Sequence, residues 1–183
     1  IDRPTTAADF SALNVLFEKR LQLQLQQVIE RASAAKIQAS VTATSSGMRI
    51  QVKGQSGNWS ALFADMLAGL QRPELDDTAL RLTLKRRLNS LAGFAQERLS
   101  SQADRLLSYQ LGRASLAQDD LAYLQKMSED HYRGFTAAYL QDAYLTLITY
   151  GPLQIEQTQQ LISAVQKLAE HGDLASHRPI DSK

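Results

Sequence analysis

The 183-residue sequence contains no cysteine. The chain therefore forms no disulfide, thiolate nucleophile or thiolate metal site, and both reducing and oxidising compartments remain open to it. Long apolar runs are also missing: the longest are a few residues, whereas a membrane helix needs about 20, so we expect no membrane partner. Neither sign of charge is in excess, because 20 basic residues stand against 19 acidic ones, for a net charge of +1. A nearly neutral chain is a weak candidate for nucleic-acid binding, and we expect no nucleic-acid partner.

The chain begins at Ile1, and neither a charged nor an apolar leader pattern follows. We therefore expect that it starts inside a larger product or at a processed end. Its length fits one domain with a core of its own. We place that domain at residues 1–172, followed by a polar tail or linker at residues 173–183.

Residues that favour helix dominate the composition, with 28 leucines, 24 alanines and 19 glutamines. The periodicity predicts one continuous helix from Phe10 to Ala35, capped by Thr5 or Thr6. Its apolar residues recur at steps of three and four and form a single stripe that faces a core. These residues are Leu13, Leu16, Phe17, Leu21, Leu25, Val28, Ile29 and Ala32.

The hydrophobic period changes from 3.6 to 2 at Lys36. Apolar and polar residues alternate over 37–44 and again over 48–53, and residues with turn-forming chemistry, Ser45, Ser46 and Gly47, lie between the two runs. This pattern predicts an antiparallel hairpin with one buried face and one wet face. A helix with Trp59 near its start should follow.

Further helices are expected from Asp76 or Asp77 to Gly93, and over 99–111, 118–126, 129–140 and about 154–168. The run from Tyr144 to Tyr150 is rich in β-branched and aromatic residues, which predicts a buried third strand. The expected fold class is therefore α+β, helix-rich, with a mostly antiparallel sheet covered by helices, in the order α-β-β-α-α-α-α-α-β-α. Because three strands make a thin sheet, we expect that a first strand is missing upstream of Ile1.

No residue emerges as a catalytic, cofactor-binding or metal-binding site, and we expect none in this chain. The three histidines have no spacing typical of zinc ligands; they are His131, His171 and His177. The paired acids stand where helices begin, where capping and the helix dipole account for them. These pairs are Asp76 with Asp77, Asp119 with Asp120, and Glu129 with Asp130.

Two other motifs also have structural explanations. Gly54-x-x-Gly57 lies between a strand and a helix, but it lacks the remaining residues of a phosphate-binding loop and predicts a plain turn. A basic cluster on the helix after Asp76 has no interleaved aromatic residues, so we interpret it as a solvated face or a docking patch for another domain. Its members are Arg81, Lys85, Arg86 and Arg87.

The order of elements nevertheless resembles a domain of the insulinase/pitrilysin-type zinc peptidases. The resemblance spans about Phe10 to Leu168 and depends on short patterns. They are the small-residue helix end Ala32-x-Ala34-Ala35, the hairpin with Gly47 and Gly54, the helix motif Leu62-Phe63-x-x-Met66-Leu67, the basic helix Leu84-Lys85-Arg86-Arg87-Leu88-Asn89 with the later Gln102-Ala103, and the strand from Tyr144 to Gly151. Pro152 stands where the family usually has asparagine.

The resemblance implies a division of labour. In this family the active domain carries H-x-x-E-H on its first helix, and the matching helix here has no histidine. The chain is thus similar to the non-catalytic third domain, the first of the carboxy-terminal half. The parent protein would bind zinc elsewhere, and this domain would line a chamber that encloses peptide substrates and pack against other domains of the same peptidase.

Within the family, the sequence is similar to the bacterial peptidase linked to synthesis of pyrroloquinoline quinone (PQQ), which trims a precursor peptide. A periplasmic pitrilysin-like protease is the nearest rival, so both bacterial cytoplasm and periplasm remain possible. Two other functions stay open. One is a helix-rich adaptor that uses the face from Arg81 to Arg87, and the other is an inactive half-size homologue that pairs with an active chain.

Overall fold

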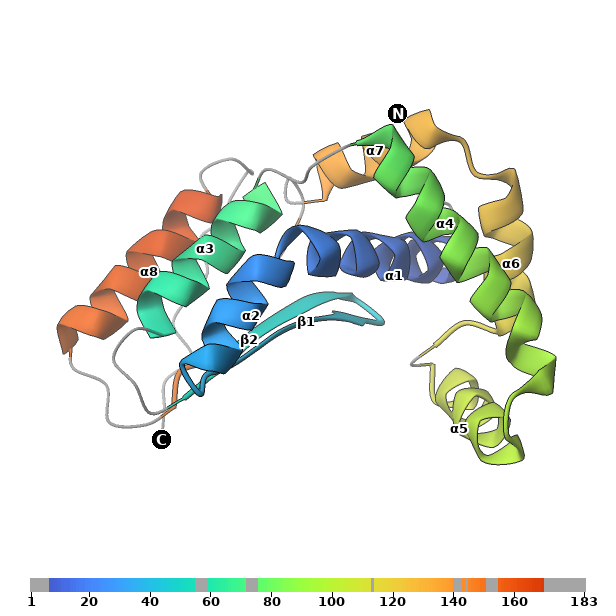
Figure 1. Ribbon diagram of the computed structural model, residues 1–183, viewed down its shortest axis with the longest axis horizontal. Coiled ribbons are helices and arrows are strands. Elements are labelled where there is room, and N and C mark those ends of the chain that lie inside the picture. Colours follow the sequence, from blue (N-terminus) through green and yellow to red (C-terminus); the bar gives the residue numbers. More distant parts are fainter. Residues whose placement is uncertain are drawn as a thin grey trace.

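A computed structural model describes residues 7–54, 59–71, 76–112, 114–139, 143, 145–150 and 155–169. Within these ranges the chain forms eight α-helices, one short 3-10 helix and one β-hairpin (Figure 1). In chain order the elements are α1 (Ala7–Gln24), α2 (Gln26–Ala34), β1 (Gln38–Thr44), β2 (Gly47–Lys53), α3 (Trp59–Gln71), α4 (Asp77–Ala92), η1 (Gly93–Gln96), α5 (Leu99–Gln110), α6 (Ala117–Lys126), α7 (Glu129–Ala138) and α8 (Ile155–Ala169). The fold is helix-rich α+β, as the sequence predicts.

The molecule has the outline of an arch (Figure 1). One limb consists of helices α2, α3 and α8 and the end of the hairpin opposite its turn. The other limb consists of α4, α5 and α6. Helix α1 lies between the limbs and contacts the hairpin as well as α4 and α6. The arch therefore has an inner, concave side along which the hairpin runs.

Helix α1 supplies the centre of the core. Its stripe residues are almost completely buried, and the core continues into the hairpin, α3, α4, α6 and α7. Phe17 packs edge-on against Phe135, with ring centroids 6.4 Å apart, and against Tyr139 at 4.9 Å. Such aromatic contacts fix the position of α7 on α1.

The first helix is interrupted, contrary to the prediction of one continuous helix. Leu25 separates α1 from α2, with φ −90° and ψ 5°. Gly69 of α3 approaches closely here, since a Cβ atom at Gly69 would lie 2.6 Å from the Leu25 side chain. The apolar stripe continues in register across the break, from Leu21 through Leu25 to Val28, so its periodicity gives no sign of the interruption.

The hairpin and its two-faced pattern agree with the prediction. Strand β1 pairs with β2 antiparallel, with Val41 opposite Ile50 and Thr44 opposite Gly47. Gly47 is therefore the first residue of β2, and the turn consists of Ser45 and Ser46. Helices α1, α2 and α3 contact the hairpin, and alternate residues such as Val41 pack on the core while the intervening ones are exposed. One face is thus covered, as expected.

The predicted third strand is wrong for the residues that the structure describes. Residues 145–150 form no strand, and β1 and β2 pair only with each other in the described sheet. Ile148 is 64% and Tyr150 88% exposed. A β-branched run supplies side chains that suit a strand, but a strand also requires a neighbour with free N–H and C=O groups, and no partner strand is described beside this segment.

The predicted helix starts are confirmed where the caps can be seen. The Asp76 carboxylate accepts hydrogen bonds from the backbone N–H of Thr78 and of Ala79, and Ser128 Oγ accepts one from the His131 N–H at 3.1 Å. These bonds satisfy N–H groups that the first turn of a helix leaves unpaired. Residues 170–183, which include the predicted tail, and the predicted caps Thr5 and Thr6 lie outside the described residues.

Candidate functional site

A buried carboxylate joins three helices in the second limb of the arch. Asp120, in the first turn of α6, is 1% exposed. Its Oδ1 atom accepts a hydrogen bond from Ser115 Oγ. Its Oδ2 atom accepts bonds from Arg87 Nη2 of α4 at 3.2 Å and from Arg105 Nη2 of α5 at 2.9 Å. We call Asp120, Arg87, Arg105 and Ser115 the Asp120 cluster.

The two arginines of the cluster are held in different ways. Arg105 also donates from Nε to the carbonyl oxygen of Ser115 at 3.2 Å, and its guanidinium lies 5.5 Å from the ring centre of Phe94. Burial lowers the pKa of Arg87, while Asp120 raises it and Arg105 lowers it. Arg87 Nε has no hydrogen-bond partner among the described residues. Asp120 therefore supplies the opposite charge that stabilises the charged form of Arg87 in this largely buried position.

A hollow of about 340 Å³ adjoins the cluster between α4, η1 and α5. Its lining is mixed, with charged, hydroxyl and apolar side chains: Arg87, Ser90, Leu91, Phe94, Glu97, Ser101, Asp104, Arg105, Ser108 and Ala114. Both oxygens of Asp120 already accept hydrogen bonds, so this carboxylate is not placed to act as a general base. The cluster is a structural clamp between helices.

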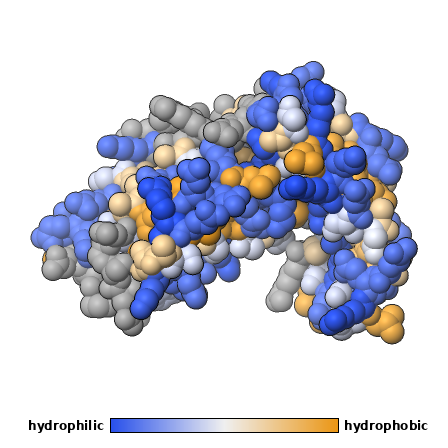
Figure 2. Space-filling view, viewed as in Figure 1, coloured by the Kyte–Doolittle hydropathy of each residue, from blue (hydrophilic) through white to orange (hydrophobic). Residues whose placement is uncertain are grey.

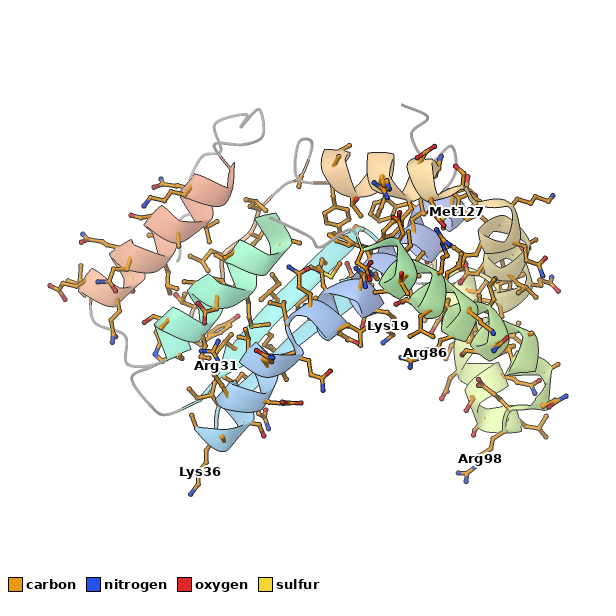
Figure 3. All side chains as sticks on the ribbon, turned by 45° about the horizontal axis from the view of Figure 1, so that its top comes forward. Lys19, Arg31, Lys36, Arg86, Arg98 and Met127 are labelled. Atoms are coloured by element: carbon orange, nitrogen blue, oxygen red, sulfur yellow. The ribbon has the colours of Figure 1, made fainter. Side chains whose placement is uncertain are left out.

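The predicted basic face is divided between several environments. Arg81 pairs with Glu129 at 2.7 Å, and both side chains are exposed. The Arg87 side chain is only 16% exposed and belongs to the Asp120 cluster, so the prediction of a solvated or docking role is wrong for this residue. Lys85 and Arg86 are exposed, and Figure 3 shows Arg86 projecting from α4 toward the inner side of the arch. Three of the four basic residues therefore remain exposed for the adaptor surface that the sequence suggested.

The acidic pairs occupy the predicted positions but not always the predicted roles. Asp76 caps α4, and Asp119 and Asp120 lie in the first turn of α6. Asp119 is exposed, which is compatible with a role limited to the helix dipole. Asp120, in contrast, is buried. The sequence did not identify the Asp120 cluster because its two arginines lie 33 and 15 residues away, on other helices.

A second buried polar group was also missed. Asn14 is 0% exposed within the apolar stripe of α1. Its Nδ2 atom donates to the carbonyl oxygens of Thr44 at 3.0 Å and Gly47 at 2.7 Å, and its Oδ1 atom accepts from Tyr139 Oη at 2.7 Å. The network fixes the turn end of the hairpin against α1 and α7. In the sequence, the sign of this network was a single asparagine, next to Leu13, among the apolar residues of the first helix.

The histidines give no metal site in the described part of the chain, where no group of three or more potential ligands occurs. His131 Nε2 lies 2.9 Å from Tyr123 Oη. His171 and His177 lie outside the described residues. No helix among the described residues is long and apolar enough to cross a membrane.

Gly54 has a packing role. A Cβ atom at this position would lie 2.8 Å from Ile37 Cγ1 and 3.3 Å from the Ile37 Cα. The residue therefore permits a close approach between the end of β2 and the start of the hairpin, which explains this glycine without a phosphate. Gly57, the other glycine of the motif, lies outside the described residues.

The open face of the hairpin forms part of the inner side of the arch (Figure 1). Its exposed residues alternate with the core-facing ones and include two cations but no acid: Gln38, Ser40, Thr42, Arg49, Gln51 and Lys53. Figure 2 shows the same side as a hollowed outline between the two limbs. This surface is polar and lightly basic.

The described residues thus form a helix-rich α+β fold with an antiparallel hairpin on its concave side. The profile of one family, described as the middle or third domain of peptidase_M16, matches residues 3–123. The chain therefore belongs to the insulinase/pitrilysin-type (M16) peptidase family, as its non-catalytic middle or third domain. The matched region ends in α6, short of the expected limit at Leu168. A search of curated proteins gives no match.

Proposed function

We propose that this chain is the non-catalytic domain of a zinc-dependent endopeptidase and forms part of the wall of a chamber that encloses peptide substrates. The observation that carries the proposal is the family match over residues 3–123. The concave face supports it, because an open hairpin face with amide, hydroxyl and cationic side chains suits contact with a peptide backbone and acidic side chains. In this proposal the zinc ligands belong to another domain of the parent protein.

The test uses the full-length polypeptide that contains this chain. We expect about one zinc ion per polypeptide, cleavage of short peptides, and loss of that cleavage when a chelator removes the metal. Restoring zinc should restore cleavage. A polypeptide that binds no zinc and cleaves no peptide contradicts the proposal and favours the inactive half-size homologue. If activity appears only after a second chain is added, the half-size homologue that pairs with an active chain is correct.

The finer proposal concerns the substrate. We infer from the resemblance that the parent trims the PQQ precursor peptide. The experiment compares cleavage of that peptide with cleavage of a scrambled peptide of identical composition by the same full-length protein. A preference for the native order supports the proposal, because a wall that recognises a sequence distinguishes the two. Equal cleavage of both peptides contradicts it and favours the broader specificity of a pitrilysin-like protease.

A further inference from the structure

Cations from both limbs of the arch lie on its inner side. The open face of the hairpin carries Arg49 and Lys53, both on β2 and both exposed. They are four residues apart on the same side of the strand, which separates their backbones by about 13 Å. Arg86 of α4 points toward the inner side from the second limb (Figure 3). We call Arg49, Lys53 and Arg86 the inner basic surface.

The inner basic surface differs from other cationic positions in having no acidic partner. Not one of its three side chains forms an ion pair or a side-chain hydrogen bond with a described residue. Three other arginines at the surface each pair with a carboxylate: Arg31 with Asp65, Arg81 with Glu129, and Arg133 with Asp77. The positive charge of the inner basic surface is therefore available to a ligand.

The helix between the limbs does not neutralise this charge. Glu18 of α1 is only 8% exposed and already accepts hydrogen bonds from Lys19 and Gln22. Figure 3 shows Lys19 projecting from α1 into the space between the limbs, where its pairing with Glu18 leaves this part of α1 nearly neutral. Free charge on the inner side thus comes from the hairpin and from α4.

Cations of this arrangement favour an anionic partner. A concave surface whose free charges have one sign raises the local concentration of ligands of the opposite sign. Arginine also binds a carboxylate through two parallel N–H···O hydrogen bonds. The molecule as a whole has a net charge of only +1, so the attraction is a property of this side and is not a general property of the chain.

We propose that the inner basic surface binds peptide segments that carry several acidic side chains, in an extended conformation across the open face of the hairpin and onward to α4. Alternate side chains of an extended peptide point to the same side, so acids four residues apart match the spacing of Arg49 and Lys53. The open face offers hydroxyl and amide groups besides its two cations, and none of its six residues is aromatic. A peptide therefore fits it better than a single-stranded nucleic acid, whose bases stack on aromatic rings.

This inference deepens the proposed function, because it names the class of peptide that the chamber wall favours. It rests on that function in taking a peptide as the partner, but binding to the surface needs neither zinc nor cleavage. The test therefore measures binding in the presence of a chelator, which keeps the peptide intact. Cleavage by the zinc-restored protein, assayed in parallel, reports on the proposed function alone, so either proposal can fail while the other holds.

The experiment measures the affinity of a fluorescein-labelled peptide for the full-length polypeptide by fluorescence anisotropy. The acidic peptide has glutamate at every fourth position, and the matched peptide has glutamine at the same positions. We expect the acidic peptide to bind about 10-fold more tightly at low ionic strength, and the difference to shrink as added salt screens the charges. Equal affinities overturn the proposal. Tighter binding of a single-stranded oligonucleotide with the same charge overturns it as well.

Neutral variants locate the binding surface. Arg49→Gln and Arg86→Gln should each weaken binding of the acidic peptide by about two- to five-fold and leave binding of the glutamine peptide unchanged. The matched control is Lys126→Gln, at an exposed lysine that forms no ion pair with a described residue. Figure 3 places its neighbour Met127 on the side away from the concavity, so this variant should change the affinity little.

Two results with these variants contradict the proposal. If Lys126→Gln weakens binding as much as Arg86→Gln, the peptide responds only to the total charge of the protein, and no selective surface exists. If Arg49→Gln weakens binding and Arg86→Gln does not, the hairpin binds alone and the peptide does not reach the second limb. Losses in both Arg49→Gln and Arg86→Gln, with Lys126→Gln unchanged, support a surface that extends across the arch.

Discussion

Asp120 is the residue whose environment differs most from what its position in the sequence indicates. It stands beside Asp119 in the first turn of α6, yet Asp119 is exposed and Asp120 accepts hydrogen bonds from Ser115, Arg87 and Arg105. Two guanidinium groups share one carboxylate, so the charge of Asp120 is what allows both to remain in this limb of the arch. The carboxylate thereby connects α4 and α5 to α6.

Asp120→Asn should destabilise the chain strongly. The substitution keeps the size of the side chain but removes the charge that Arg87 and Arg105 face, and breaking such a pair costs about 3 kcal/mol. The free energy of unfolding in urea measures the effect. Asp119→Asn, the neighbouring control, should change it by no more than about 0.5 kcal/mol. Adding Arg87→Met to Asp120→Asn should recover part of the loss, and no recovery would argue against the cluster.

Tyr139 gives a prediction about alkaline pH. Burial raises the pKa of its phenol above the ordinary value, which is about 10 in an unfolded chain. The unfolded chain therefore loses this proton first as pH rises. The contribution to stability is complete below about pH 10 and declines above it, by up to about 1.4 kcal/mol per pH unit for one such group.

Tyr139→Phe should therefore reduce the pH dependence of stability between about pH 10 and about pH 11.5. The substitution also removes the hydrogen bond to Asn14, which lowers stability at every pH by about 1 kcal/mol, so the slope is the informative quantity. Tyr150→Phe, at a tyrosine that is 88% exposed, is the matched control for removing a phenol. Urea unfolding at a series of pH values measures both. An unchanged slope for Tyr139→Phe would show that its phenol does not titrate with unfolding.

At the scale of elements, periodicity predicts which segments are helices. It fails where contact with a distant segment determines the local structure. The helices, the caps at Asp76 and Ser128 and the alternating faces of the hairpin follow from local patterns. At the interruption, Leu25 lies against Gly69, which is 44 residues further along the chain. The strand predicted at 144–150 depends on a partner strand that is not described beside 145–150. The Asp120 cluster and the Asn14 network were missed for the same reason, since sequence spacing does not encode contacts between distant elements.

Two glycines at the ends of elements should respond to alanine in opposite directions. Gly54→Ala forces a Cβ atom to within 2.8 Å of Ile37 Cγ1, and overpacking of this kind costs about 1 to 3 kcal/mol. Gly93, after α4, has φ −77°, and a Cβ atom there would meet no atom of the described residues within 4 Å. Gly93→Ala should stabilise the chain by about 0.4 to 1 kcal/mol, because it restricts the unfolded state.

Thermal or urea unfolding of the two glycine variants measures this difference. The pair controls for the general effect of replacing glycine by alanine, since only the surroundings differ between the two positions. A loss of stability at Gly93 equal to that at Gly54 would contradict the packing explanation. The same result would leave the reason for Gly54 open to another function of the strand-to-helix connection.

At the scale of the whole molecule, the arch separates two kinds of surface. The core lies along α1, the hairpin turns its uncovered side to the concavity, and α5 carries leucines at the end of one limb (Figure 1). In the proposed peptidase, the concave surface meets the peptide. The net charge of +1 fits this arrangement, because the two cations of the hairpin, Arg49 and Lys53, make only this surface basic and leave the molecule as a whole nearly neutral.

Charge reversal on the hairpin tests the concave surface. In the full-length protein, Arg49→Glu with Lys53→Glu should lower kcat/KM for an acidic peptide several-fold, mainly through KM, and raise it for a basic peptide of the same length. The control is Lys126→Glu, an exposed lysine at the end of α6. Equal effects on acidic and basic peptides would indicate that the hairpin does not face the substrate.

The Asn14 network also joins parts of the chain that are synthesised far apart in time. Tyr139 follows Asn14 by 125 residues, so the nascent chain carries α1 and the hairpin long before the phenol that completes their polar contact leaves the ribosome. Until then the carboxamide oxygen of Asn14 lacks its partner, and water must serve it instead. We expect α1 and the hairpin to close over a dry core only after α7 is made, which makes this domain a late folder whose hairpin stays accessible to chaperones during translation.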